Sequence, residues 1–365
     1  MTRKTIMTFK KHKLLARKPQ DLTVDWAQHV IAQHDKNAII THVKLLNVDV
    51  GTTTRIRLKV EIDGAAHLPR SWFIKLPSLS WRARTITTLP RLLQNEVRFY
   101  NELAHKVPVK KPHCLAAHSQ FGRGATLVLA DIAENAHIPC KPNHALNRKQ
   151  AEVIIEQLVN FHAHFWHDIH QPHYQWLKGS VRQLEDALGS ALALPLMQRG
   201  LKLAGSTVPK SLHNAALRYA KHRRNIMHYL HQAPHTLIHH DCHSGNLFWN
   251  DDQSQAGFLD WQLVRTGEGV SDIAYFLANA LNPETRKKHE FQLLADYQRQ
   301  MHAKGIHLNP EQLKQRYRAH LTYAFEAMIV TLAVGNLMNK EHNLELIRRT
   351  AAAVHDLDAF AALPW

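Results

Sequence analysis

The chain is poor in cysteine and has no long apolar run. Its three cysteines, Cys114, Cys140 and Cys242, are odd in number and far apart, which excludes both a disulfide framework and a Cys-x-x-Cys zinc site. A reducing compartment fits this pattern, and we expect a cytoplasmic protein. The most apolar stretch, residues 324–338, is shorter than the ~20 residues of a membrane-spanning helix and includes Glu326. We expect no transmembrane segment.

Acidic residues are also few. The 30 Asp and Glu residues stand against 46 Lys and Arg, which gives a formal net charge of +16. Such a charge attracts anions and tolerates nucleic acid or an acidic membrane surface, but we expect no specific nucleic-acid partner. Residues 1–20 contain no acidic residue and no long apolar core, so they do not form a secretory signal. We predict a basic N-terminal tail there, with an organelle transit peptide as the alternative.

Residues 21–128 carry β-rich runs with helical stretches among them. Apolar residues at helical spacing predict a first helix that begins near Asp21 or Thr23, and a second across residues 90–106. Short turns join most of the β-rich runs, which predicts an antiparallel sheet. Its strands are expected at 42–50, 54–62, 71–77 and 125–132. We expect a small α+β lobe with one key helix.

From Asn147 onward the pattern becomes helical, which predicts a helical C-terminal lobe over residues 135–365. Residues 129–134 are expected to link the two lobes. Two strand-like runs inside the helical part predict a β-hairpin at 236–262. Amphipathic stretches predict long helices at 147–169, 211–231, 284–303 and 311–338. The fold class is therefore α+β, with a small antiparallel-sheet N-terminal lobe and a larger, mostly helical C-terminal lobe.

A dense polar cluster, HHDCHSGN at residues 239–246, lies between apolar segments. Asp241 and Asn246 are five positions apart, and Gly245 relieves the backbone of the tight loop that turns both side chains toward one point. Asp260 follows on the next strand. Carboxylate and amide oxygens are hard ligands that suit magnesium, which also binds phosphate oxygens. The set predicts phosphoryl transfer, with Asp241 free to accept a proton from an attacking hydroxyl.

These residues resemble a known motif. HHDCHSGN is similar to the H-G-D-x-H-x-x-N catalytic loop of the aminoglycoside phosphotransferase and choline kinase-like superfamily, which has a protein-kinase-like fold. FLDW resembles the metal-binding aspartate segment of that superfamily. The segments LVNFHAHFWH and LTVDWAQHVI are most similar to its ecdysteroid kinase-like branch, which includes bacterial members. The resemblance covers about residues 22–280 and implies a two-lobed kinase that uses ATP and Mg²⁺.

The resemblance also implies a role for each residue of the cluster. Asp241 corresponds to the catalytic base, and His239 corresponds to the histidine that braces the loop. Asn246 and Asp260 correspond to the metal ligands.

The nucleotide-binding residues implied by the resemblance precede the helical part. The strand WFIK supplies Lys75, which would form an ion pair with Glu96 and aim its ammonium group at the nucleotide phosphates. Glu102 is the alternative partner on the same helix. The backbone of the linker LVLADI would contact adenine at Ala130 and Ile132. The turn before the second strand would cover the phosphates, and its hydroxyl groups would come from Thr52, Thr53 and Thr54.

The sequence departs from the family pattern at three places. His240 stands where the family has glycine, which matters if that glycine has a positive φ. Ser244 replaces the usual small residue or proline. The nucleotide-covering turn has one glycine, Gly51, in place of G-x-G-x-x-G. His240 in particular keeps open a pseudokinase scaffold that binds nucleotide without transferring phosphate.

Several polar residues near the motif have alternative interpretations. Asp272 would either cap the helix that follows it or, as the resemblance implies, brace the catalytic hairpin. His243 would hydrogen-bond within the loop or approach the substrate phosphate. His162, His164 and His167 share a helix with aromatic neighbours, so packing and capping explain them better than a zinc site.

These features predict an ATP- and Mg²⁺-dependent phosphotransferase that phosphorylates a hydroxyl group of a small molecule. The positive charge favours a neutral or anionic acceptor over polycationic aminoglycosides or choline. A basic module that binds nucleic acid or a membrane surface is the remaining alternative, but it leaves Asp241, Asn246 and Asp260 unexplained. The sequence specifies neither the acceptor, nor the choice between ATP and GTP, nor the oligomeric state.

Overall fold

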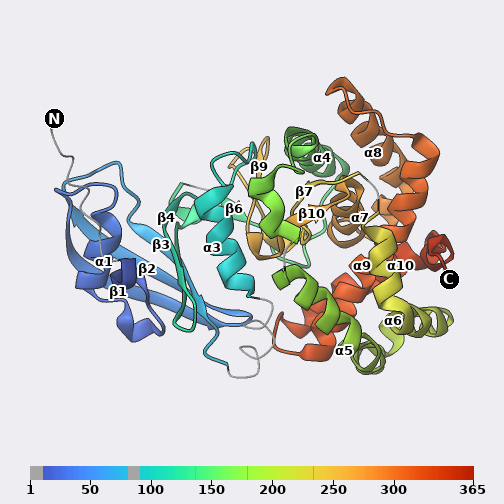
Figure 1. Ribbon diagram of the computed structural model, residues 1–365, viewed down its shortest axis with the longest axis horizontal. Coiled ribbons are helices and arrows are strands. Elements are labelled where there is room, and N and C mark those ends of the chain that lie inside the picture. Colours follow the sequence, from blue (N-terminus) through green and yellow to red (C-terminus); the bar gives the residue numbers. More distant parts are fainter. Residues whose placement is uncertain (1–10, 81–90, 136, 179, 233) are drawn as a thin grey trace. The chain divides into compact units, whose positions relative to one another are not determined.

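The computed structural model describes residues 11–80, 91–135, 137–178, 180–232 and 234–365 (Figure 1). They form two compact units. Unit 1 lies within residues 1–105 and 112–135, and unit 2 comprises residues 106–111 and 136–365. The segment 129–134, expected as a linker, falls in unit 1. Of the basic tail expected at residues 1–20, residues 1–10 lie outside the described residues.

Unit 1 contains a five-stranded antiparallel sheet with the strand order β1-β2-β3-β5-β4 (Figure 1). Four of these strands confirm the predicted ones. The pattern does not predict β4, because its sequence CLAAHSQ mixes small and polar residues without a clear apolar alternation. The strands are β1 (Ile39–Val50), β2 (Thr53–Asp63), β3 (Ser71–Pro77), β4 (Cys114–Gln120) and β5 (Gly124–Ala130).

Two α-helices in the described part of unit 1 pack against this sheet. The helix α1 (Val24–Ile31) begins after Thr23, whose side chain accepts a hydrogen bond from the N–H of Trp26 at 3.2 Å. Trp26 is buried and anchors α1 in the core of this unit. The helix α3 (Leu92–Glu102) contacts β4 and β5 and carries Glu96 among its buried residues.

Unit 2 is mostly helical (Figure 1). Its helices α4, α6, α8 and α9 confirm the four predicted ones. The amphipathic pattern does not mark α7, which was expected only as the helix that follows Asp272, because this helix is buried along its whole length and lacks an exposed polar face. No helix in the described residues is long and apolar enough to span a bilayer. The α-helices of this unit are α4 (Arg148–Phe165), α5 (Ser180–Ala204), α6 (Lys210–Leu230), α7 (Gly269–Ala280), α8 (Pro283–Ala303), α9 (Pro310–Val334) and α10 (Lys340–Asp356).

In the described part of unit 2, short strands form two small sheets. The hairpin predicted at 236–262 is only partly right, because its first strand, β7, belongs to a different sheet from β8 and β9. The polar residues 239–246 therefore connect two sheets, which explains the apolar segments on both sides of them. The sheets consist of β7 (Thr236–Ile238) with β10 (Arg265–Gly267), and of β6 (Ile138–Pro139), β8 (Leu247–Trp249) and β9 (Ala256–Phe258).

Candidate active site

Residues 239–246, here called the polar loop, are anchored by a carboxylate on α7. Asp272 is fully buried, and its carboxylate oxygens accept hydrogen bonds from the backbone N–H groups of His239 (2.7 Å) and His240 (2.8 Å). Asp272 lies inside α7, whose N-cap residue is Glu268. The prediction that Asp272 caps a helix is therefore wrong, and the alternative that it braces the loop is confirmed.

Asp272 is in turn held by a buried histidine of α4. Nε2 of His162 lies 3.3 Å from Oδ2 of Asp272, and Nδ1 lies 3.1 Å from the hydroxyl of Tyr297. Gly269 makes room for this contact, because a Cβ atom there would lie 2.4 Å from the Tyr297 hydroxyl and 2.8 Å from Nδ1 of His162. His162 thus has a structural role. Among the described residues, no three His, Cys, Asp or Glu side chains are grouped so that they could hold a metal ion.

His239 is a neutral imidazole with both nitrogens engaged. Nε2 donates to the carbonyl oxygen of Leu259 at 2.8 Å, since a carbonyl can only accept, and Nδ1 accepts from the N–H of Asp241 at 3.3 Å. Burial lowers the pKa of His239 below its usual value, which keeps the ring neutral. The residue connects the polar loop to the segment after β9 and has no nitrogen left for chemistry, which supports the predicted bracing role.

His240, at the position of the family glycine, has a positive φ of 70°. A left-handed conformation costs a residue with a side chain about 1–2 kcal/mol. The buried His240 ring stacks on Tyr323, with ring centroids 4.3 Å apart and planes inclined by 17°, and such a contact contributes about 0.5–1.5 kcal/mol. The stacking, together with the hydrogen bond to Asp272, offsets the strain. The loop therefore keeps the conformation that a glycine with positive φ would give it.

Asp241 is the acidic residue of the polar loop, and two donors fix its carboxylate. The Tyr275 hydroxyl donates to Oδ1 at 2.8 Å, and the Asn246 side-chain amide donates to Oδ2 at 2.9 Å. Burial, followed by the charge of Asp241, raises the pKa of Tyr275 well above its usual value, so the phenol stays protonated and remains a donor. The Asp241 side chain keeps 16% of its surface exposed. A carboxylate that is fixed yet accessible can accept a proton from a bound hydroxyl.

Tyr275 was not predicted from the sequence as a site residue. It lies three positions after Asp272 on α7, so both side chains leave the same face of the helix. Asp272 holds the backbone of the polar loop, and Tyr275 holds the carboxylate. Asp272 and Tyr275 at this spacing within the mostly apolar segment GVSDIAYFLANA were the available indication.

Asn246 and Asp260 are the residues predicted to bind magnesium. The amide nitrogen of Asn246 donates to the backbone oxygen and to Oδ2 of Asp241, both at 2.9 Å, so its side-chain oxygen is directed away from that residue. The backbone oxygen of Asn246 accepts from the N–H of Leu259 at 2.8 Å, which brings Asp260 near Asn246. One amide oxygen and one carboxylate fit magnesium, which usually takes its other ligands from water and phosphate.

The rest of the polar loop is held by contacts within the loop and with residues 142–144. Nδ1 of His243 accepts from the N–H of Gly245 at 3.0 Å, which confirms the alternative of a hydrogen bond within the loop. Its Nε2 lies 3.9 Å from Oδ1 of Asp241, beyond hydrogen-bond distance. Gly245 is needed for space, because a Cβ atom there would lie 2.7 Å from the ring of Pro142. The Ser244 hydroxyl donates to a backbone oxygen at 2.9 Å and so adds a further tie.

In unit 1, the predicted ion pair between Lys75 of β3 and Glu96 of α3 is present. The ammonium nitrogen of Lys75 lies 2.8 and 2.9 Å from the two carboxylate oxygens of Glu96. Both residues are buried, with 4% and 0% exposure. The alternative partner, Glu102, pairs instead with Arg98 on the helix surface at 2.7 Å. Contact with both oxygens fixes the position of the ammonium group.

The threonines predicted to cover the phosphates lie where β1 turns into β2. Thr53 and Thr54 are buried at the start of β2, whereas Thr52 is half-buried in the turn. The Thr54 hydroxyl accepts from the N–H of Leu79 at 2.9 Å. Thr54 therefore stabilises the turn, and Thr52 has the most accessible of the three side chains.

The two residues predicted to contact adenine follow one another closely in unit 1. Ala130 ends β5, and its N–H donates to the carbonyl oxygen of His113 at 2.8 Å. An adenine contact at Ala130 would therefore use the carbonyl group. Ile132 begins the 3-10 helix Ile132–Asn135.

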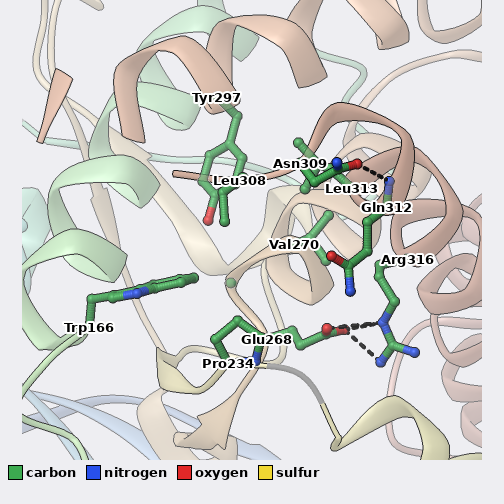
Figure 2. Close-up of a pocket in the computed structure, with 11 residues that line it drawn as sticks. Trp166, Pro234, Glu268, Val270, Tyr297, Leu308, Asn309, Gln312, Leu313 and Arg316 are labelled. Carbon is green, nitrogen blue, oxygen red and sulfur yellow. Dashed lines mark hydrogen bonds and ion pairs between the residues drawn. The ribbon is translucent and has the colours of Figure 1, made fainter. Parts of the chain in front are cut away.

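Two cavities that the described residues of unit 2 line differ in size. The smaller has a volume of ≈ 60 Å³, and the close-up in Figure 2 shows Trp166 and Tyr297 on its wall together with the ion pair of Glu268 and Arg316. Pockets for small molecules usually measure about 300–1,000 Å³, so this cavity is too small for an acceptor. The larger cavity, of ≈ 870 Å³, is lined by α5, α6 and β10.

Comparison with known proteins gives both a family and a fold. A model described as the ecdysteroid kinase-like family matches residues 50–309. A solved structure of a putative aminoglycoside phosphotransferase from Ralstonia eutropha has a TM-score of 0.51 and 10% sequence identity, covering 93% of this chain and 98% of its own. This similarity confirms the predicted kinase-like fold. No curated protein matches this chain.

Two further solved structures have lower TM-scores. The ethanolamine kinase from Plasmodium vivax has a TM-score of 0.49 at 14% identity, covering 94% of this chain and 91% of its own. The choline kinase LicA from Streptococcus pneumoniae has a TM-score of 0.47 at 10% identity, covering 90% of this chain and 98% of its own.

Proposed function

This chain belongs to the ecdysteroid kinase-like family, and on that premise we propose that it transfers the γ-phosphoryl group of ATP to a hydroxyl group of a small molecule. It is an enzyme of the small-molecule kinase class. The observation that carries the proposal is the state of Asp241, whose carboxylate is fixed by Tyr275 and Asn246 while part of its surface stays exposed. A polar turn with a merely structural role would not need an accessible carboxylate held in this way.

In the proposed reaction Asp241 orients the acceptor and takes its proton. Each oxygen of this carboxylate accepts one hydrogen bond within unit 2, which leaves further acceptor positions for the O–H of the acceptor. As the acceptor oxygen forms its bond to the γ-phosphorus, the bond from the γ-phosphorus to the bridging oxygen of ADP breaks, and the hydroxyl proton passes to Asp241. The braces from Asp272 and His239 keep the loop in place for this step.

The remaining residues are assigned to the nucleotide and its metal. Asn246 and Asp260 would hold Mg²⁺, which supplies positive charge to the phosphate oxygens when it is bound. Lys75, fixed by Glu96, would bind the phosphates directly. The backbone of Ala130 and Ile132 would contact adenine. The hydroxyl groups of Thr52, Thr53 and Thr54 would contact the phosphates.

The acceptor is proposed to be a neutral or anionic hydroxylated molecule, because a chain of net charge +16 is poorly suited to polycations. The free cysteines fit a reducing compartment, so we place the enzyme in the cytoplasm. A basic binding module would not account for the polar loop. A pseudokinase is less favoured because His240 adopts the required backbone conformation and the predicted transfer residues are present.

Thermal unfolding with and without Mg-ATP tests the nucleotide site. We expect the midpoint of the unmodified protein to rise with Mg-ATP, because a ligand that binds only the folded state stabilises it. In Asp260→Asn the rise should disappear, since asparagine tolerates the left-handed backbone at φ 57° but lacks the charge that holds magnesium. Asp251→Asn, on the exposed turn after β8, is the matched control and should behave like the unmodified protein.

Two other outcomes of this experiment have distinct meanings. No rise in the unmodified protein would overturn the kinase proposal. A rise that needs no magnesium and survives Asp260→Asn would instead support a pseudokinase.

A further inference from the structure

The larger cavity of unit 2 has a size suited to a small molecule. Its volume is ≈ 870 Å³, within the usual range of about 300–1,000 Å³ for ligand pockets. The residues that matter for its chemistry come from α5, α6, β10 and the segments next to them. They are Lys178, Asp186, Arg224, His231, His235 and Arg265.

Among the described residues that line the cavity, lysine and arginine side chains outnumber carboxylates. Its carboxylate among the described lining residues, Asp186, is engaged by the buried Arg265 at 2.8 and 3.2 Å. Burial alone would raise the pKa of Asp186, but Arg265 holds it below its usual value, so the pair is charged on both sides. Lys178 and Arg224 form no ion pair with a carboxylate in the described part of the chain. Two cations on the wall of one cavity favour an anionic group in it.

Two histidines of the cavity wall present hydrogen-bond acceptors. Nδ1 of His231 lies 2.6 Å from the carbonyl oxygen of Met227, and Nε2 of His235 lies 2.6 Å from the carbonyl oxygen of His231. A carbonyl can only accept, so these nitrogens carry the protons, and the other nitrogen of each ring has a lone pair. Burial, followed by the charge of Arg265, lowers the pKa of His231 to about 4, and burial lowers that of His235. Both rings can therefore accept hydrogen bonds from hydroxyl groups at neutral pH.

The pairing of β7 with β10 connects the wall of the cavity to the polar loop. Arg265 of β10 pairs with Ile238 of β7, and paired Cα atoms in an antiparallel ladder are roughly 5 Å apart. Asp241 follows Ile238 by three residues, which span at most ~11 Å of extended chain. The Cα atoms of Arg265 and Asp241 are thus no more than roughly 16 Å apart. An acceptor that binds in the cavity would therefore have to extend over no more than roughly this distance to reach Asp241.

We propose that this cavity binds the acceptor, and that the acceptor is a polyhydroxylated molecule with an anionic group such as a phosphate or carboxylate. Arg224 and Lys178 bind the anionic group. His231 and His235 accept hydrogen bonds from hydroxyl groups that are not phosphorylated. The inference rests on the proposed kinase function and narrows its acceptor to one chemical class.

Calorimetric titration of the full chain with glucose 6-phosphate, glucose and inorganic phosphate tests the proposal. We expect glucose 6-phosphate to bind at least about tenfold more tightly than glucose, and the double variant Arg224→Gln/Lys178→Gln to lose that difference. Lys221→Gln is the matched control, because Lys221 is exposed on α6, the helix that carries Arg224, and does not line the cavity. His235→Phe should weaken glucose 6-phosphate but leave inorganic phosphate unchanged.

Three results would overturn the proposal. The first is equal affinity for glucose and glucose 6-phosphate. The second is a loss of affinity for glucose 6-phosphate in Lys221→Gln that equals the loss in the double variant. The third is no binding of glucose 6-phosphate or inorganic phosphate in the millimolar range. Thermal unfolding of the same proteins with Mg-ATP tests the kinase proposal independently of the cavity proposal. If Mg-ATP stabilises the protein but the phosphate compounds do not bind, the cavity proposal fails and the kinase remains. If the phosphate compounds bind but Mg-ATP has no effect, the acceptor role fails together with the kinase.

Discussion

The ion pair of Lys75 and Glu96 in unit 1 and the polar loop of unit 2 are positioned by different means. In unit 1 the ammonium group of Lys75 is fixed by the buried carboxylate of Glu96, a contact between two side chains. In unit 2 the position of Asp241 depends on buried groups that hold the backbone of the polar loop, above all Asp272 and His162. Both partners of a side-chain ion pair can be replaced together, so that no buried charge is left unpaired. A side chain that accepts hydrogen bonds from the backbone cannot be replaced without leaving buried N–H groups unsatisfied. Stability and activity should therefore separate in unit 1 and fall together in unit 2.

The largest effect is expected for the brace. Asp272→Ala leaves the N–H groups of His239 and His240 without their acceptor, and each unsatisfied buried donor costs about 1–3 kcal/mol. We expect a loss of about 3–5 kcal/mol in the free energy of unfolding, measured by urea titration, together with loss of kinase activity. Asp272→Asn keeps one accepting oxygen and should lose roughly half as much.

The matched control for the brace is Asp251→Ala, an exposed aspartate in the turn after β8. It should leave stability within about 0.5 kcal/mol of the unmodified protein. If Asp272→Ala were no more destabilising than this control, the polar loop would not depend on the brace, and the contrast between the two units would be lost.

The second effect concerns the ion pair of unit 1. Lys75→Met should lower kcat/KM for ATP by about 100-fold, which is about 3 kcal/mol of transition-state stabilisation. It should also destabilise the fold, because the Glu96 carboxylate is buried and loses its cation. The double variant Lys75→Met/Glu96→Gln removes both charges. It should recover most of the stability but none of the activity.

Lys59→Met serves as the control for this pair, since Lys59 is exposed on the neighbouring strand β2. A double variant that recovered activity along with stability would mean that Lys75 has a structural role alone. Activity and thermal midpoint, measured on the same preparations, decide between these results.

The same contrast explains how much of the site could be read from the sequence. Asp241, Asn246 and Asp260 were predictable because they occur in a fixed order between short apolar segments. Residues so close in sequence also remain close in the folded chain. The strand β2 alternates apolar and polar residues, and β3, which carries Lys75, is a short β-rich run, so the positions of both strands were predictable too.

The supporting residues were less accessible from the sequence. His162 lies 110 positions from Asp272, and only the packing of α4 against α7 brings them together. Tyr275 lies on a helix that is buried on every side, so no amphipathic pattern marks it. The pairing of β7 with β10 rather than with its neighbour in sequence was also hidden, because strands of three residues are too short to show a register.

The smallest effect is expected for Tyr275→Phe, which removes the donor to Oδ1 of Asp241 and keeps the ring. One hydrogen bond to a charged group contributes about 1.5–3 kcal/mol, so kcat should fall by roughly 10- to 100-fold. The KM for ATP should stay unchanged, because Tyr275 positions the group that receives the acceptor proton. Tyr317→Phe is the matched control, since its buried hydroxyl donates to Glu290 at 3.2 Å, outside the polar loop.

Both phenol variants remove a buried hydrogen bond and should lower stability by similar amounts, so stability alone cannot separate them. Their kcat values can. A fall in kcat confined to Tyr275→Phe would show that α7 positions the carboxylate as well as the backbone of the polar loop. Equal kcat values for the two variants would show that Asn246 alone orients Asp241, and that Tyr275 contributes to packing only.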